Sequence, residues 1–591
     1  MKRWVLCAFE ALVPTAMVSI ALFWHQEIGS YAFMPESSLS TVIPVTLMLF
    51  LFFIVWFLGK RKKWSASVFL TAILFSVFFT ISTMISDDLK DVNTYSLLSL
   101  LVRLIGILPL WYAAVHLLYA FLDQRQEKRH TLSLERKMAE RKGKLKLQLI
   151  YAGILLAMWI PYLVCYYPGN MTIDTANSIL HFYGALESPN NPWILNCLYG
   201  TVIRIGDSFG TANIAFFCFC LLQGLLFVWL LSEMLVQLWT RGMSPVLLGL
   251  LLLVYGAIPS FSAYAFCMGK DSSFALCLLW LGVNLLKVEE TGLASSKKNW
   301  VLFAVSCIFV PLTRNGVWVA VLFLLAILFR KVKEERRLLA GTALLVLLTN
   351  IGIPRLLSET NSVAENLSIP LQQVARTFEK QQEQISPEEL IQYKSIMKQK
   401  YWEKYKTGIS DPVKKHFEQR PTEAYLTTFF NLWFTELQRF PRTYMDAAIL
   451  MNYAYYVPLA DRSDLKTKLF LGLPGSRVEL LEENTTLRQT ENAGLTAVKK
   501  LQKTMDQIPL LRLLTHIGFY SWLLMGGWIY CISRKKGSIS WLLLFMPLIV
   551  FIGCCFSPVN GYYRYAYPMI LVTPVFTGAA VSLTGNDYST L

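Results

Sequence analysis

Long apolar stretches, separated by short polar connections, recur along most of the chain. A helix that crosses a membrane needs about 20 mostly apolar residues, and about fourteen stretches approach that length. They lie at residues 4–24, 41–59, 64–84, 97–121, 147–165, 212–236, 245–263, 272–287, 300–314, 316–329, 337–353, 509–532, 539–557 and 568–584. The first follows Lys2 and Arg3 and precedes no A-x-A cleavage site, so we expect an uncleaved anchor. The pattern predicts an all-α, polytopic membrane protein.

Basic residues gather in every second connection between these stretches. They lie at Lys60–Lys63, 125–146, Arg241, Lys297-Lys298, 330–337 and 534–536. Because cytoplasmic connections carry an excess of Lys and Arg, the alternation predicts a multi-pass protein of the cell membrane with both termini in the cytoplasm. The external connections are then residues 25–40, 85–96, 166–211, 264–271, 313–316, 354–508 and 557–567.

Residues 300–329 leave two alternatives open. The two apolar arms of this segment are only about 15 residues long, shorter than a usual membrane span. They could form a hairpin around Thr313–Gly316 or a single kinked helix. A single helix would reverse the predicted sidedness of every later connection.

The long basic connection divides the chain into parts. We expect an accessory transmembrane bundle at 1–121, a basic cytoplasmic linker at 122–146 and the first part of a transmembrane core at 147–353. An extracytoplasmic domain follows at 354–508, and 509–591 completes the core. This domain has helical character, for example where Ser386 precedes Glu388 and Glu389 as a helix cap would.

The composition supports a membrane protein. Of the 591 residues, 54% are hydrophobic and only 16% are charged, whereas soluble domains carry about 25% charged residues. This excludes a disordered chain and an ordinary cytosolic enzyme. The net charge of +16 is concentrated beside the apolar stretches, so it reflects membrane sidedness and predicts no nucleic-acid partner. The eleven cysteines include no CxxC pair, so neither a zinc site nor a disulfide framework is predicted.

The first long external loop carries Asp174, Ser178 and His181 at the spacing of one helix face. A carboxylate so close to the bilayer surface could act as a general base on a polar acceptor. Alternatively, Asp174 caps its helix or complements the helix dipole. His181 could contribute to the same site or be an ordinary surface or core histidine.

Two further external connections carry charge at the membrane boundary. Lys270 could neutralise a phosphate, and Asp271 could hold a metal ion or a sugar hydroxyl. Alternatively, Asp271 is a helix cap and Lys270 extends to the interface. Arg314 lies between apolar stretches, and an arginine inside a membrane costs at least a few kcal/mol, so it should face either a substrate or a buried acidic partner.

The last external loop places Arg564 among four tyrosines, which are Tyr562, Tyr563, Tyr565 and Tyr567. The planar guanidinium group pairs bidentately with phosphate oxygens, which suits the phosphate of a lipid. A tyrosine such as Tyr563 could flank a sugar or a polyprenyl chain. The alternative is an aromatic belt at the interface with an arginine that extends to the headgroups.

Acidic and basic groups from four external loops thus lie near the membrane boundary. Together they suit a substrate with an apolar tail in the lipid, a phosphate at the interface and a polar group outside. The sequence contains neither a P-loop nor an HExxH pair, so a nucleotide-phosphate site and a zinc protease have no support.

An ordered set of segments resembles a known family. The segments are YYPGNMTIDT, MGKDSSF, LTRNG, IPLQQVARTF, SDPVKKHF, RFPRTYMDAAILMNYAYYVP and SPVNGYYRYAYP. They are similar to an uncharacterised family of bacterial polytopic membrane proteins of the GT-C glycosyltransferase type. The resemblance covers residues 147–584 and does not extend to 1–121.

The resemblance implies a GT-C-like core, with Asp174 as the essential acidic residue of the first external loop and Asp271 as a second one. Relatives often carry a His-Pro pair downstream of the first aspartate, where this chain has Asn190-Asn191-Pro192. A histidine role at that point is therefore not expected here.

The expected function is an inverting glycosyltransferase that moves a sugar from a polyprenyl-phosphate donor to a glycan, lipid or protein acceptor on the external face. Asp174 would act on the acceptor, and Lys270, Arg314 and Arg564 would bind the donor phosphate. No cofactor is certain, and a divalent cation stays an alternative. A flippase or transporter of lipid-linked substrates and an envelope assembly protein are the rival functions.

Overall fold

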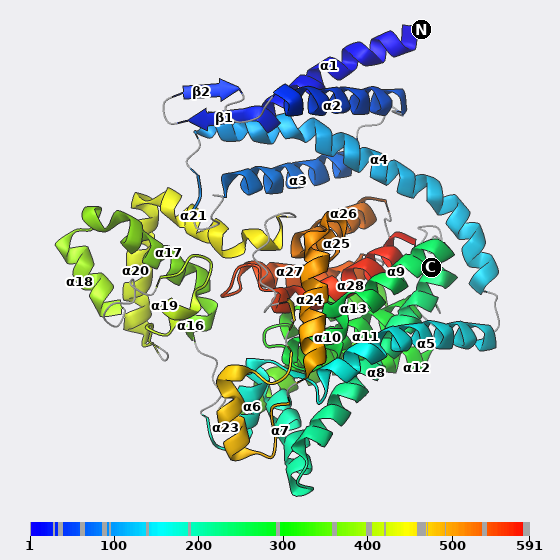
Figure 1. Cartoon of the computed structure of the whole chain (residues 1–591), viewed down its shortest axis with the longest axis vertical. Helices are drawn as coiled ribbons and strands as arrows, with labels where there is room; N and C mark the ends of the chain where they lie inside the picture. The colour runs from blue at the N-terminus through cyan, green and yellow to red at the C-terminus, as the bar shows by residue number, and fades with distance from the viewer. Residues whose placement is uncertain are drawn as a thin grey trace.

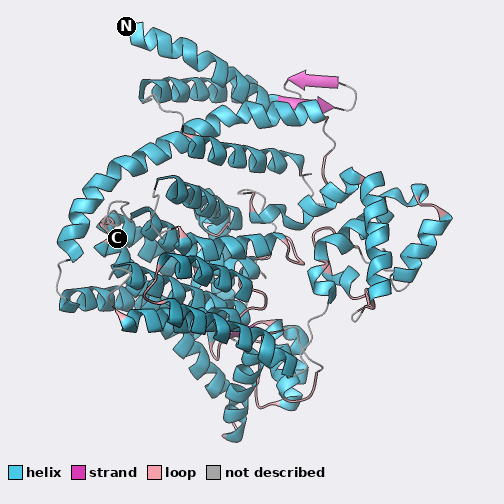
Figure 2. Ribbon diagram, turned by 180° about the vertical axis from the view of Figure 1, so that it is seen from behind, coloured by secondary structure: helices cyan, strands magenta, loops and turns pink. Residues whose placement is uncertain are grey.

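The computed structural model is almost entirely helical, as the sequence predicts (Figures 1 and 2). It describes residues 2–27, 30–33, 39–59, 65–85, 91–93, 96–137, 141–186, 191–290, 296–356, 363–396, 405–418, 421–457, 468–469, 471–490, 492–534 and 541–582. The named strands in this part of the chain form two short pairs. Strands β1 (Trp24–Glu27) and β2 (Ser30–Phe33) pair antiparallel, whereas β3 (Asn170–Met171) and β4 (Cys267–Met268) pair parallel.

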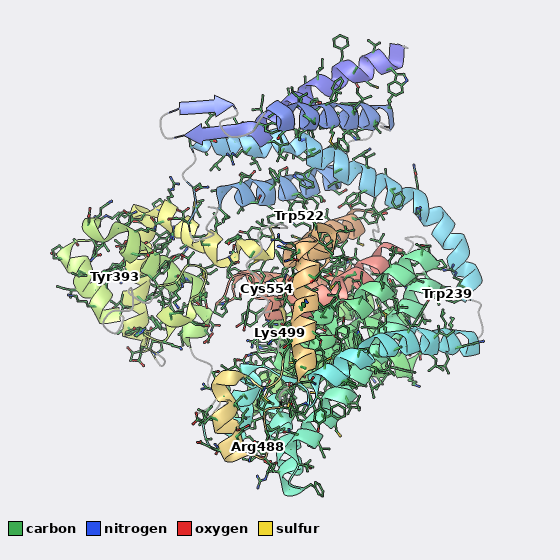
Figure 3. The ribbon with its side chains drawn as sticks, viewed as in Figure 1. Trp239, Tyr393, Arg488, Lys499, Trp522 and Cys554 are labelled. Carbon is green, nitrogen blue, oxygen red and sulfur yellow. The ribbon has the colours of Figure 1, made fainter. Side chains whose placement is uncertain are left out.

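The N-terminal helices form a layer beside the core, drawn in blue in Figure 1. This accessory layer consists of α1 (Lys2–Phe23), α2 (Leu39–Gly59), α3 (Ala66–Met84) and α4 (Leu97–Lys137). It meets the core where the Phe75 ring stacks on Trp522, with 4.2 Å between the ring centroids, and where Tyr119 donates to the Gly526 carbonyl. Trp522 is labelled in Figure 3.

The predicted linker at 122–146 is not an open loop. Helix α4 continues to Lys137 and α5 begins at Arg141, so most of this segment is helical. The reason is local, because the stretch is rich in Gln, Glu, Lys, Arg and Leu, which are good helix formers, and contains no proline.

The transmembrane core is built around α28. Its helices are α5 (Arg141–Tyr166), α8 (Ala212–Thr240), α9 (Pro245–Ala257), α10 (Pro259–Ala265), α11 (Lys270–Glu290), α12 (Lys297–Leu312), α13 (Trp318–Lys331), α14 (Arg336–Leu347), α15 (Ile353–Leu356), α26 (Ile517–Arg534), α27 (Leu542–Cys555) and α28 (Tyr563–Ser582). Helix α28 packs against α8, α11, α26 and α27. The most apolar windows of α28 and α11 are 83% and 72% buried, against 17% for α5, so α28 and α11 are central and α5 is peripheral.

Nine of the described helices are long and apolar enough to cross a membrane. Helices α9 and α10, which meet at a bend of 65°, could form a tenth span together. The remaining predicted stretches, 300–314, 316–329, 509–532 and 539–557, are also helical but fall short of this length or apolarity. The chain therefore has the make-up of a multi-pass membrane protein.

Residues 300–329 form a hairpin. Helix α12 runs antiparallel to α11 and ends at Leu312, and the chain turns through Gly316, whose φ of 81° suits glycine. The next helix then runs back, because the Phe323 ring lies 5.3 Å from that of Phe545, near the start of α27. The predicted single kinked helix is therefore excluded.

With this hairpin, the predicted external loops lie at one end of the bundle. Arg477 donates to Asn177, so 166–211 and 354–508 meet there, and Trp193 donates to the Thr349 carbonyl, just before the second segment begins. The starts of α1 and α5 and the end of α28 lie toward the opposite side in Figure 1. The basic runs at 60–63 and 535–536 lie outside the described residues. We call the two sides the outer end and the inner end.

The segment after α15 forms a helical domain at the outer end, at the left in Figure 1. It contains α16 (Val363–Asn366), α17 (Ser368–Gln381), α18 (Pro387–Ile396), α19 (Asp411–Lys414), α20 (Glu423–Arg439) and α21 (Pro441–Asn452). Ser386 and Glu389 exchange backbone and side-chain hydrogen bonds at the start of α18, as the predicted cap requires. Five further helices belong to the outer end, namely α6 (Ile173–Phe182), α7 (Trp193–Ser208), α23 (Val478–Asn484), α24 (Ala493–Gln507) and α25 (Pro509–Leu514). Helices α6, α7 and α23 lie at the bottom in Figure 1, and α24 lies across the front of the core.

Candidate functional site

A two-residue parallel strand pair brings two predicted site segments together. In this pair, Asn170 lies opposite Cys267 and Met171 lies opposite Met268. Each strand is followed within two residues by a helix, α6 after β3 and α11 after β4. Because parallel strands end at the same edge, the first turns of both helices emerge side by side.

The approach to β3 depends on a tight turn. Gly169 has φ of 146° and donates its N–H to the Tyr166 carbonyl. A Cβ atom at this position would lie 2.6 Å from the sulfur of Cys220, so glycine is required for close packing on α8. The chain therefore turns at Pro168-Gly169 before it enters β3.

Charged residues occupy the first turns of three helices at this place. Asp174 is the second residue of α6, Lys270 and Asp271 open α11, and Arg564 is the second residue of α28. Arg314 comes from the turn between α12 and α13. Helix N-termini favour negative charge, so three of them at one place make a suitable surrounding for carboxylates or a bound anion.

The five side chains form a linear chain of alternating charge. Lys270 Nζ lies 2.9 Å from Asp174 Oδ2, and Arg564 Nη2 donates to the same oxygen at 2.9 Å. Arg564 Nε also lies 3.1 Å from Asp271 Oδ2, and Arg314 Nη1 donates to Asp271 Oδ1 at 3.2 Å. We call this set the five-charge chain. It holds three cations and two carboxylates, so one positive charge is left over.

Burial distinguishes the centre of the chain from its ends. The side chains of Arg564 and Asp271 are 4% and 3% exposed. Those of Lys270, Asp174 and Arg314 are 23–24% exposed. The centre is therefore a fixed ion pair, whereas the two outer cations and one carboxylate remain accessible to a ligand.

Aromatic rings complete the surroundings of the two arginines. The guanidinium carbon of Arg564 lies 5.1 Å from the ring centroids of both Tyr562 and Tyr565. Tyr565 also lies 6.0 Å from the Arg314 guanidinium, and Phe274 lies 5.5 Å from it. Cation–π contacts of this kind stabilise a charge that has little access to water.

The electrostatic environment fixes the ionisation of Asp174. Burial alone would raise the pKa of its carboxyl, but the charges of Arg564 and Lys270 outweigh burial and hold the pKa well below its ordinary value. Both cations contact Oδ2, and no side chain of the described residues donates to Oδ1. Asp174 is thus a carboxylate with one oxygen bound by two cations, and its side chain lines the cavity described next.

A polar cavity of about 640 Å³ adjoins the five-charge chain. Its wall on the core includes Asp174, Lys270 and Trp318. Its wall on the outer domain includes Glu365, Asp411 and Lys414. The cavity is of the size that small-molecule sites occupy, and it lies where the membrane core meets the outer domain.

The outer wall of the cavity is itself held by ion pairs. Lys414 Nζ lies 2.6 Å from Glu365 Oε2 and 2.9 Å from Asp411 Oδ1, and the Lys414 side chain is only 6% exposed. The Ser410 N–H donates to the Pro558 carbonyl, which ties this wall to the loop that precedes Arg564. This hydrogen bond thus joins the outer-domain wall of the cavity to the core wall.

The structure brings Asp174, Lys270, Asp271, Arg314 and Arg564 together but leaves two predicted residues outside the cluster. His181 Nδ1 lies 3.1 Å from the Leu186 carbonyl, in the turn that ends α6. The Tyr563 hydroxyl is buried against Ser260 Oγ at 2.9 Å. Both contacts are structural, and neither side chain lines the cavity.

The structure also decides the alternative roles of the two aspartates. Thr172 is the N-cap of α6 and accepts from the Thr175 N–H, so Asp174 lies inside the first turn and is not the cap. Asp271 lies in the first turn of α11, and its carboxylate is directed to the two arginines. For Arg314, the acidic partner that its position demands is Asp271.

Several site residues are absent from the sequence prediction. Asn191 accepts from Lys270 Nζ at 2.7 Å and donates to the Asp174 carbonyl and to Ser178 Oγ, so it fixes the start of α6 beside α11. Asn191 precedes Pro192, and so it stands where relatives often carry the histidine of a His-Pro pair. Its neighbour Asn190 lies outside the described residues. Glu365, Asp411 and Lys414 were not singled out, although SDPVKKHF, which contains the last two, was one of the distinctive segments.

The residues of this site do not fit a divalent cation. Asp174 and Asp271 are each bound by two cationic side chains. Among the described residues, no group of three His, Cys, Asp or Glu side chains is placed to hold a metal ion. A hard cation needs several free oxygen ligands, so no step of the proposal below uses one.

A comparison with protein families matches residues 184–583 to the family of unknown function DUF6020. The chain belongs to this family. No curated protein and no solved structure matches the chain. The part that matches DUF6020 contains Lys270, Asp271, Arg314 and Arg564, whereas Asp174 and the accessory layer precede it.

Proposed function

We propose that the chain is an integral-membrane glycosyltransferase of the GT-C type. It would transfer a sugar from a polyprenyl-phosphate donor to a cell-envelope acceptor on the external face of the membrane. The observation that carries this proposal is the five-charge chain, which has an excess positive charge and opens to a polar cavity at the outer end of a membrane core.

The donor phosphate would bind at the two ends of the five-charge chain. Lys270 and Arg314 are partly exposed and each holds only one carboxylate, so both can turn toward an incoming anion. Arg564 is buried between two carboxylates and acts as a positioning residue. This arrangement supports a lipid-linked phosphate, because the cations lie where an apolar tail can stay in the bilayer.

The transfer is a single displacement at the anomeric carbon of the donor sugar. An acceptor hydroxyl oxygen forms the new bond to that carbon while the bond from the carbon to the phosphate oxygen breaks. The acceptor proton passes to Asp174 Oδ1, and the electron pair leaves with the polyprenyl phosphate. Lys270 and Arg314 stabilise the negative charge that develops on the phosphate oxygen.

Binding of the donor would also raise the pKa of the Asp174 carboxyl. In the free protein Arg564 and Lys270 hold its pKa low, which makes it a weak base. A phosphate at Lys270 offsets one of these charges and raises the basicity of Asp174. The base is therefore strengthened only when the donor is present, which limits loss of the sugar to water.

The test compares Asp174→Asn with the wild-type protein in membranes that contain a polyprenyl-phosphate sugar. We expect release of free polyprenyl phosphate to fall at least about 100-fold, because general-base catalysis contributes about 10²–10⁴-fold. Glu233→Gln is the matched control. Glu233 is an ion-paired carboxylate at the inner end, far from the cavity, so transfer should remain near normal.

Near-normal release of polyprenyl phosphate by Asp174→Asn would contradict the mechanism. The rival function, transport of a lipid-linked substrate, predicts a different result. A transporter would move the labelled lipid across the bilayer of proteoliposomes while the bond between sugar and phosphate stays intact.

A further inference from the structure

Helix α24 crosses the direction of the membrane-spanning helices. Figure 1 shows it, in orange, running across α5 and α28, and it packs against α5 and α10. Its first end lies at the outer membrane boundary, because Asn492 Nδ2 donates to the Val164 carbonyl near the end of α5. Helix α24 therefore runs across the outer part of the bundle and not parallel to the helices that could span a membrane.

The rotation of α24 about its own axis is fixed at both ends. At the C-terminal end, Asp506 Oδ1 lies 3.0 Å from Lys468 Nζ and accepts from Thr515 Oγ1 at 3.1 Å. The Lys468 side chain is 1% exposed, so this ion pair is sheltered from water. Because both ends are held, each face of the helix has a constant surrounding.

The surface of α24 divides into three faces, whereas an ordinary surface helix has one apolar and one polar face. One face is buried against the core through Val498, Gln502 and Met505. A second face is apolar but exposed, with Leu501 42% and Ile508 46% exposed. At 100° per residue these two faces lie about 75° apart around the helix axis and adjoin each other. The apolar surface of α24 is therefore wider than the part that the core covers, and its exposed edge needs an apolar surrounding of its own.

The third face carries three lysines. Lys499, Lys500 and Lys503 are all exposed and lie within about 100° of one another around the axis. None of them has an acidic partner in the part of the chain that the structure describes. Lys499 is labelled on α24 in Figure 3.

We infer that the face formed by Lys499, Lys500 and Lys503 binds the anionic headgroups of phospholipids in the outer leaflet. The exposed apolar face would enter the acyl region, and Leu510, which is 71% exposed in the following helix, continues it. The lysines lie about 140° from this apolar face around the axis, on the polar side of the helix, which is the arrangement of helices that lie in a membrane interface. Their long side chains can extend to the lipid phosphates. This inference does not depend on the proposed transferase activity.

The experiment counts the lipids that stay bound to the protein. Protein in nanodiscs of equal parts phosphatidylcholine and phosphatidylglycerol is released into mild detergent and analysed by native mass spectrometry. We expect each change of Lys499, Lys500 or Lys503 to Gln to lower the bound phosphatidylglycerol-to-phosphatidylcholine ratio about two- to fivefold. The triple variant should retain the least phosphatidylglycerol.

A second triple variant controls for net charge. Lys394, Lys406 and Lys415 are exposed on the outer domain, away from α24, so their change to Gln should leave the ratio as in wild type. Equal ratios in the α24 triple variant and in wild type would overturn the inference. Loss of a co-purifying protein from that variant, with its lipid ratio unchanged, would also overturn it and favour a protein partner.

A photoreactive benzoylphenylalanine tests the orientation of α24 separately. At position 501 it should cross-link to phospholipid, because the apolar face is placed in the acyl region. At position 496, on the polar side of the helix, it should cross-link much less. Equal cross-linking to lipid at both positions would contradict the three-faced arrangement.

Discussion

The two ends of the helix bundle hold their charged side chains in different ways. At the inner end Lys287 pairs with Glu233, and Arg534 Nε lies 3.3 Å from Asp123. In each of these two pairs one cation contacts one carboxylate. At the outer end two carboxylates are shared among three cations, and one positive charge is left over.

This difference separates a structural role from a binding role. A pair with one cation per carboxylate is neutral and needs no further partner. A shared chain with an excess charge is stable only while its geometry is kept, and it attracts an anion. The polar cavity adjoins the outer end, whereas a cavity of about 460 Å³ nearer the inner end, lined by Met243, Trp522 and Tyr530 among others, is almost entirely apolar.

The largest effect is expected for Arg564→Ala. This change leaves Asp174 without one cation and Asp271 without its buried partner, and breaking a buried ion pair costs about 3–5 kcal/mol. Thermal and chemical unfolding in detergent should show this loss, together with loss of polyprenyl phosphate release. A stable and active variant would contradict the central place of Arg564.

Arg564→Lys sharpens the comparison further. Lysine keeps the charge, but a single ammonium group cannot reproduce two guanidinium nitrogens that contact two separate carboxylates. We expect the free energy of unfolding to fall by about 2–3 kcal/mol and turnover to be lost at matched expression. Normal turnover would show that the two separate guanidinium contacts of Arg564 are not needed for catalysis.

The pH dependence of stability should distinguish the shared chain from an isolated carboxyl. Arg564 and Lys270 keep the pKa of Asp174 low despite burial, so its contribution to stability is complete above about pH 4 and is lost only at lower pH. Glu436 in the outer domain is the contrast, because burial and then Glu389 raise its pKa to about 7.

For Glu436 the pH dependence of the contribution to stability has the opposite sign. Its protonated form is favoured in the folded state, so the contribution of Glu436 to stability is highest below about pH 4 and decreases as the pH rises toward 7. We expect Glu436→Gln to remove a decrease on the order of 2 kcal/mol between pH 4.5 and 7, measured by unfolding at several pH values. Asp174→Asn should leave this decrease unchanged. The prediction would be wrong if Asp174→Asn removed the decrease and Glu436→Gln did not.

The smallest effect is expected at the inner end. Lys287→Gln breaks a pair whose side chains are 29% and 17% exposed, and pairs with such access to water contribute about 0–1 kcal/mol. Unfolding and turnover should both remain close to wild type. A loss as large as that of Arg564→Lys would show that the two ends do not differ in the proposed way.

The sequence alone determined the class of the protein and most of its helices. Apolar length and helix propensity are local properties, so nearly all described residues of the predicted stretches are helical, and the hairpin at 300–329 is one of the two conformations that its short apolar arms allow. The basic runs likewise group the external loops at one end of the bundle. Helix α4 continues into the linker at 122–146 because the residues there are good helix formers, whereas their basic charge predicts only the side of the membrane on which the linker lies.

Only the tertiary structure decided which charged residues form one site. Arg564 and Asp174 are 390 residues apart in sequence, and no local pattern relates them. Their contact depends on the two-residue parallel pair between β3 and β4 and on the central position of α28. His181 shares a helix face with Asp174 in sequence but turns to a backbone carbonyl, whereas Asn191 enters the site from a loop. Helices depend on neighbours along the chain, whereas ion pairs depend on distances across the fold. For this reason the sequence predicts the five charged residues of the site but not which of them contact one another.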